Sequence, residues 1–148
     1  MSDILRIDGV LQHLGTSVAG DADEYMVGRL LLTGTDAHFV AAWRGERPRN
    51  PQAGRLANEV ELGKFAGRVV PRTAGSPLFD QVIELDPVEQ VRKVKGSLSM
   101  CRADGAQFKL RWLSPVLVAK LSTGATLSFT LPDADARRRV KAWLARAS

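Results

Sequence analysis

The chain holds few side chains of the types that perform covalent or metal chemistry. Among its 148 residues, His13 and His38 are the two histidines and Cys101 is the single cysteine. These three residues lack the short spacings of metal ligands, and no base is spaced to activate the thiol. No serine lies in a G-x-S-x-G sequence, and no glycine loop has the order of a nucleotide-binding motif. The sequence therefore predicts no enzyme activity, no metal and no cofactor.

Basic side chains are the group whose spacing points to binding. Arg92, Lys93 and Lys95 lead directly into a pair of alternating segments that carry Lys109 and Arg111. Such side chains bind phosphate and carboxylate groups. We therefore expect these five residues to form one cationic surface for an anionic group or a partner. The alternative interpretation is a solvated sheet face whose lysines protect an edge strand.

Six more arginines are secondary candidates for binding. They are Arg44, Arg47, Arg49, Arg55, Arg137 and Arg138. The first four fall in residues 44–58, where proline and glycine without periodicity predict a long exposed loop or insertion. The other two lie in the first half of a predicted C-terminal helix.

Positive charge is concentrated in the C-terminal part of the chain. The formal net charge is +5, but residues 1–40 hold 2 basic and 6 acidic side chains, whereas residues 87–148 hold 12 basic and 4 acidic. This asymmetry points to an acidic partner, an anionic lipid or a nucleic acid. The length and the 45% hydrophobic content fit one globular domain spanning residues 1–148. No membrane-spanning run or signal peptide is recognisable, so we expect a cytoplasmic protein, with a peripheral membrane location as an alternative.

The position of Lys109 and Arg111 depends on how residues 97–102 and 107–112 pair. Both segments alternate between apolar and polar residues, and Ala103-Asp104-Gly105 between them is a hairpin signal. A two-residue turn would place Lys109 opposite Met100, on the apolar face. A three-residue loop with Gly105 in the left-handed region pairs Met100 with Phe108 instead. We therefore expect a hairpin in the second register, with Lys109 and Arg111 outward and with Phe108 and Trp112 inward.

A helix is predicted for the last segment. Asp133 is a suitable N-cap, and Ala136, Val140, Trp143 and Leu144 recur at the spacing of one apolar helical stripe. A helix with one apolar face needs a sheet to cover, and Trp143 is the largest side chain available to fill that contact.

The remaining segments predict further strands. Residues 27–33 with 37–43, and residues 116–121 with 126–131, read as two hairpins, while residues 4–18 fit either a helix or a strand. Residues 79–85 read as a strand that ends at Asp86-Pro87, and residues 88–95 as a short basic segment.

This order of elements resembles the pleckstrin-homology superfold and, within it, the GRAM-like domains. The resemblance rests on residues 28–33, on residues 82–91 and on the terminal helix at 134–147, and it covers roughly residues 25–147. It implies a mainly β (α+β) fold, a bent barrel of about seven strands capped by one C-terminal α-helix. It also implies a binding module for proteins or phosphoinositides without catalysis.

The sequence thus favours a protein-interaction adaptor. The alternative is a binder of anionic lipid headgroups, and nucleic acid is less supported because Phe108 and Trp112 are assigned inward rather than to the basic surface.

Overall fold

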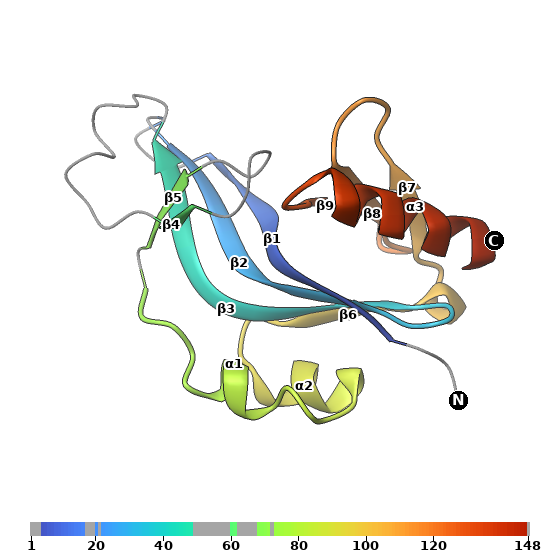
Figure 1. Ribbon diagram of the computed structural model, residues 1–148, viewed down its shortest axis with the longest axis horizontal. Coiled ribbons are helices and arrows are strands. Elements are labelled where there is room, and N and C mark those ends of the chain that lie inside the picture. The colour runs from blue at the N-terminus through green and yellow to red at the C-terminus, as the bar shows by residue number, and fades with distance from the viewer. Residues whose placement is uncertain are drawn as a thin grey trace.

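A computed structural model of the chain describes residues 4–16, 20, 22–48, 60–61, 68–71 and 73–147. That part contains nine strands, three α-helices and a short 3₁₀ helix (Figure 1). The elements are β1 (Leu5–Thr16), β2 (Ala22–Leu32), β3 (Ala37–Pro48), β4 (Val60–Glu61), β5 (Arg68–Pro71), α1 (Leu78–Gln81), α2 (Pro87–Lys93), β6 (Leu98–Met100), η2 (Arg102–Asp104), β7 (Gln107–Leu110), β8 (Val116–Lys120), β9 (Thr126–Thr130) and α3 (Ala134–Ala147).

The strands form an antiparallel sheet that is not closed into a barrel. Eight of them follow the order β4-β5-β3-β2-β1-β9-β8-β7, and β6 pairs with β3 beside this path. The expected mainly β fold with a C-terminal helix is confirmed, but the expected closed barrel is wrong. Closure fails because β6 pairs with β3 and β7 pairs with β8, so these two strands do not join.

A bend crosses the three longest strands at one level. The β1–β2 register shifts between Ile7 and Val10, and the β2–β3 register shifts between Val27 and Gly28. Val10 pairs with Gly28, so the two irregularities lie side by side. Bulges increase the local twist and bend of a strand, and Figure 1 shows β1, β2 and β3 curving together. The open question of helix or strand for residues 4–18 is answered by β1.

Helix α3 covers one face of the sheet, as predicted. The Asp133 carboxylate accepts a hydrogen bond from the backbone N–H of Ala136 at 2.8 Å, which is the expected N-cap. Ala136, Val140 and Trp143 are buried in the largest apolar cluster, together with strand residues such as Phe39. The two hairpins predicted for residues 27–43 and 116–131 are also confirmed, as β2–β3 and β8–β9.

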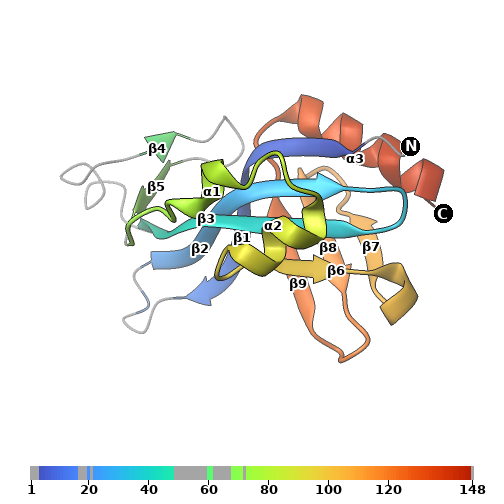
Figure 2. The ribbon, with the colours of Figure 1, turned by 90° about the horizontal axis from the view of Figure 1, so that it is seen from below.

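The opposite face is covered by α1 and α2 (Figure 2). Leu31 and Val40 of the sheet pack there against Val82 and Val94. The predicted strand at residues 79–85 is therefore wrong, since this segment forms α1 and the turns after it. Residues 87–93 form a helix because Asp86 caps it, accepting from the N–H of Glu89, and a proline occupies the first helical position.

The predicted hairpin between residues 97–102 and 107–112 does not form. Gly105 does adopt the left-handed conformation, with φ of 95°, but it ends the 3₁₀ helix η2. Met100 pairs with Ala37 of β3, and Phe108 pairs with Ala119 of β8. The local turn signal was correct, whereas both strands find their partners elsewhere in the sheet.

Candidate functional site

The basic residues of α2 lie on the face of the sheet opposite α3. Arg92 donates to the carboxylate of Glu89, with Nη2 and Oε2 2.6 Å apart, and this hydrogen bond lowers the pKa of Glu89. Lys93 ends the helix and Lys95 follows it, and all three cationic side chains are exposed.

Lys109 and Arg111 belong to a different part of the sheet. Lys109 lies on β7 and is exposed, and Arg111 follows that strand. Ser99 and Ser97 were expected to face them across a hairpin. Instead, the Ser99 hydroxyl lies 2.8 Å from His38 Nδ1, and the Ser97 hydroxyl accepts from the N–H of Ala41. The pairing that was to join the five residues into one surface is therefore wrong, and their role in binding stays a prediction.

The structure brings Arg111 together with α3 instead. Arg137 donates from Nη2 to the Arg111 carbonyl at 3.1 Å and from Nε to the Ser114 carbonyl at 3.3 Å. The guanidinium thus holds both sides of the loop between β7 and β8. Arg138, one residue further, forms an ion pair with Asp135 on the same helix.

The other secondary candidates lie at the far end of β3. This strand extends to Pro48, so Arg44 and Arg47 lie in a strand and the predicted loop cannot begin before residue 49. Arg44 pairs with Glu24 at 2.9 Å, and Arg47 donates to the Tyr25 hydroxyl at 3.0 Å. Burial raises the pKa of that hydroxyl. Arg49 and Arg55 lie outside the described residues.

A groove runs beside β7 on its α3 side. It has a volume of about 530 Å³. Its lining consists of Arg102, Ala106, Gln107, Phe108, Lys109, Leu110 and Leu144. No described strand pairs with the outer edge of β7, because this strand ends the sheet order. The groove therefore combines an unpaired strand edge with apolar side chains from the sheet and the helix.

Comparison with protein-family models, with curated proteins and with solved structures finds no match to this chain. The site is therefore interpreted from its own geometry. None of the helices in the described ranges is long and apolar enough to span a membrane. Within the same ranges, no three or more histidine, cysteine or acidic side chains gather in a way that would hold a metal ion.

Sequence reasoning missed a buried arginine. Arg29 of β2 is 1% exposed and donates from Nε and Nη2 to the Gln90 side-chain oxygen at 3.0 and 2.7 Å. Nη2 also donates to the Phe79 carbonyl at 2.7 Å, and the guanidinium lies 4.0 Å from the centre of the Phe79 ring. Burial lowers the pKa of Arg29. The contacts join α1 and α2 to the sheet, so we assign this cluster to the fold rather than to a ligand.

A signal for this cluster was present in the sequence. Residues 26–32 are apolar at nearly every position on both faces of the strand, apart from Arg29. Strands buried on both faces read as continuous apolar runs. An arginine within such a run must be buried, and buried arginines need acceptors.

His38 is buried beside Ser99, and this burial lowers its pKa below the ordinary value of 6.5, with Asp36 and Asp86 opposing the shift. As pH falls from about 6.5 toward the lowered pKa, the unfolded chain takes up a proton that the folded state does not. We therefore expect the free energy of unfolding to fall in this window, by at most about 1.4 kcal/mol per pH unit. Urea unfolding at several pH values measures the slope.

The control for this effect is His38→Gln, which keeps a polar side chain but cannot titrate. The variant should lose the part of the pH dependence that lies between 6.5 and the lowered pKa. An unchanged slope would assign that pH dependence to other groups.

Proposed function

We propose that the protein is a non-catalytic binding module that docks an extended segment of a partner protein along β7. The observation that carries the proposal is the unpaired outer edge of β7 beside a groove of about 530 Å³. An exposed strand edge presents unpaired backbone N–H and C=O groups, and an added strand satisfies them. Backbone hydrogen bonds then provide affinity, and the groove selects side chains.

The groove favours a partner of defined chemistry. Phe108 and Leu110 project toward the apolar cluster from β7, and Leu144 faces them from α3. Arg102 and Lys109 add positive charge to the lining. Side chains of an added strand point alternately to opposite faces. The best-fitting segment therefore places apolar residues at every second position, with acidic residues nearby.

We infer a pleckstrin-homology-like architecture of the GRAM-like type. The support is the order β3-β2-β1-β9-β8-β7, in which β1 pairs with both β2 and β9 and α3 covers the adjoining face. That arrangement leaves the sheet open between β6 and β7, and the groove lies at this opening.

The chemistry of the reactive side chains supports a role without catalysis. Burial raises the pKa of the Cys101 thiol, and Asp36 and Asp104 act in the same direction, so the thiolate nucleophile is disfavoured. His38 is buried against Ser99, and its lowered pKa keeps it neutral at physiological pH. No proton transfer to a substrate is required of either group in the proposed binding role.

The proposal is tested by selecting a library of random displayed peptides on the purified protein. We expect selected peptides to alternate apolar residues, with acidic residues nearby, and to protect β7 amides from hydrogen exchange. Leu144→Glu should weaken their binding at least about tenfold, because the new carboxylate must lose water to fit the groove.

The matched control is Leu78→Glu, which places the same change at an exposed leucine of α1. It should leave peptide binding unchanged. Failure to select any peptide, or protection confined to strands other than β7, would contradict the proposal.

A further inference from the structure

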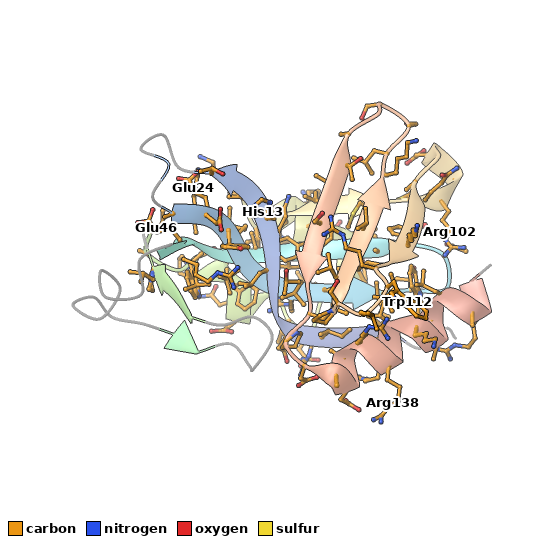
Figure 3. All side chains as sticks on the ribbon, turned by 90° about the horizontal axis from the view of Figure 1, so that it is seen from above. His13, Glu24, Glu46, Arg102, Trp112 and Arg138 are labelled. Atoms are coloured by element: carbon orange, nitrogen blue, oxygen red, sulfur yellow. The ribbon has the colours of Figure 1, made fainter. Side chains whose placement is uncertain are left out.

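The loop between β7 and β8 presents two large apolar side chains to solvent. Trp112 is 85% exposed and Leu113 is 83% exposed, more than any other large hydrophobic residue in the described part of the chain. The expectation that Trp112 faces inward is therefore wrong. β7 ends at Leu110, so the alternation along the strand no longer determines where the Trp112 side chain points. Figure 3 shows Trp112 at the end of the hairpin that lies beside α3.

The backbone of this tip, defined as Trp112 and Leu113, is held in place although its side chains are not. Arg137 donates to the carbonyls of Arg111 and Ser114, on either side of the tip. Leu113 has φ of 64°, in the left-handed region that a leucine rarely adopts. Such a conformation persists where the surrounding contacts determine it, and it occurs at binding sites. The exposure of both side chains is thus built into the loop.

Positive charge surrounds the tip. Residues 105–132 include no aspartate or glutamate, and they include Lys109 and Arg111. On α3, Lys141 lies one turn after Arg137 and is exposed. The nearest acidic residues on that helix are engaged, since Asp133 caps it and Asp135 pairs with Arg138.

We propose that the tip inserts into the interfacial region of a bilayer that contains anionic lipids. Lys109, Arg111 and Lys141 then lie at the level of the headgroups. Tryptophan is enriched at membrane interfaces, and stable attachment of a peripheral protein combines apolar insertion with basic residues. The site goes beyond the proposed peptide groove, whose lining does not include the tip.

The chemistry of the tip favours a bilayer as the partner over a nucleic acid or another protein. A nucleic acid would stack on Trp112, but Leu113 has no ring and is equally exposed. A stable protein interface buries roughly 1,200–2,000 Å² in total, and two side chains supply a small fraction of that area. A bilayer needs no complementary surface, so two projecting side chains are sufficient for insertion.

Vesicle sedimentation tests the proposal. The intact chain should sediment with vesicles of phosphatidylcholine and phosphatidylserine, and much less with phosphatidylcholine alone. Trp112→Ser combined with Leu113→Ser should reduce this binding at least about tenfold. Val88→Ser is the matched control, since Val88 is 58% exposed on α2, across the sheet, and should have no effect.

Two more variants separate the contributions. Leu113→Gly relieves the left-handed backbone, so it should keep or raise thermal stability while weakening vesicle binding. Lys109→Glu with Arg111→Glu should abolish the preference for phosphatidylserine and its salt dependence. Absent vesicle binding by the intact chain, or equal binding by the tip variants, would overturn the proposal. The proposal would also be overturned if the tip variants lose binding to an RNA or a protein from cell lysate but still bind vesicles.

Discussion

Replacing Gln90 by leucine is expected to lower the free energy of unfolding by about 3 kcal/mol, measured by urea denaturation. The Gln90 side chain is 3% exposed and accepts two hydrogen bonds from the buried Arg29 guanidinium. Leucine accepts none, so a buried positive charge loses its main partner. The amide nitrogen of Gln90 also donates to the Leu85 and Ile83 carbonyls, and those oxygens lose a donor as well.

The size of this effect follows from how the Arg29 charge is balanced. Among the described residues, no carboxylate forms an ion pair with Arg29. The guanidinium contacts the Gln90 oxygen, the Phe79 carbonyl and the Phe79 ring instead. These dipoles replace the water that the guanidinium loses on burial. Removing one member of a buried pair of a charge and its acceptor is far more destabilising than replacing both members by apolar side chains.

The control is therefore the double variant Gln90→Leu with Arg29→Met. It replaces the charge and its acceptor by apolar side chains, so it should be less destabilised than Gln90→Leu alone. If the free energy of unfolding of the double variant falls by as much as the losses of the two single variants added together, Arg29 and Gln90 act independently. The assignment of this cluster to the fold would then be wrong.

Trp143→Ala is expected to lower the free energy of unfolding by about 3–5 kcal/mol. Trp143 is buried at the centre of the contact between α3 and the sheet, and its ring lies edge-on to Phe108 with centroids 5.3 Å apart. Its indole N–H donates to the Thr33 carbonyl, and the Arg102 guanidinium lies 5.3 Å from the ring. Alanine leaves a cavity between α3 and the sheet.

Trp143→Phe separates packing from the hydrogen bond. Phenylalanine keeps an aromatic ring but leaves the Thr33 carbonyl without its donor, so a loss of about 1–3 kcal/mol is expected. Thermal and urea unfolding of both variants measure the difference. A larger loss for phenylalanine than for alanine would contradict the view that Trp143 acts mainly by filling the core.

The elements predicted correctly from the sequence are those whose signals are local. Asp133 and the stripe through Trp143 define α3 without reference to other segments, and the turns before residues 37 and 126 define their hairpins. Gly105 illustrates the limit of this reasoning. The sequence identified its left-handed conformation, but the partners of the flanking strands depend on β3 and β8.

The candidate site was predicted only in part for the same reason. Lys109 and Arg111 are exposed as expected, but the Arg111 carbonyl accepts a hydrogen bond from Arg137 of α3, a contact that the sequence did not predict. The two short helices were missed because their apolar residues are few and their position depends on Arg29, a contact between distant segments. Neither the groove at β7 nor the exposed tip could be predicted from the alternation of apolar and polar residues. Both lie where the hydrogen-bonded pairing of strands stops.

The pairing of β1 with β9 has a consequence for the order of folding. Leu11 pairs with Thr130, and Gln12 pairs with Phe129, so the first strand completes its hydrogen bonds with the last one. Contacts between such distant positions slow folding, because a long loop must close before they form. During synthesis, β1 can pair with β2 long before β9 leaves the ribosome. The N-terminal strands are then expected to wait with an apolar face uncovered, which makes this the interval in which the chain is most prone to aggregation.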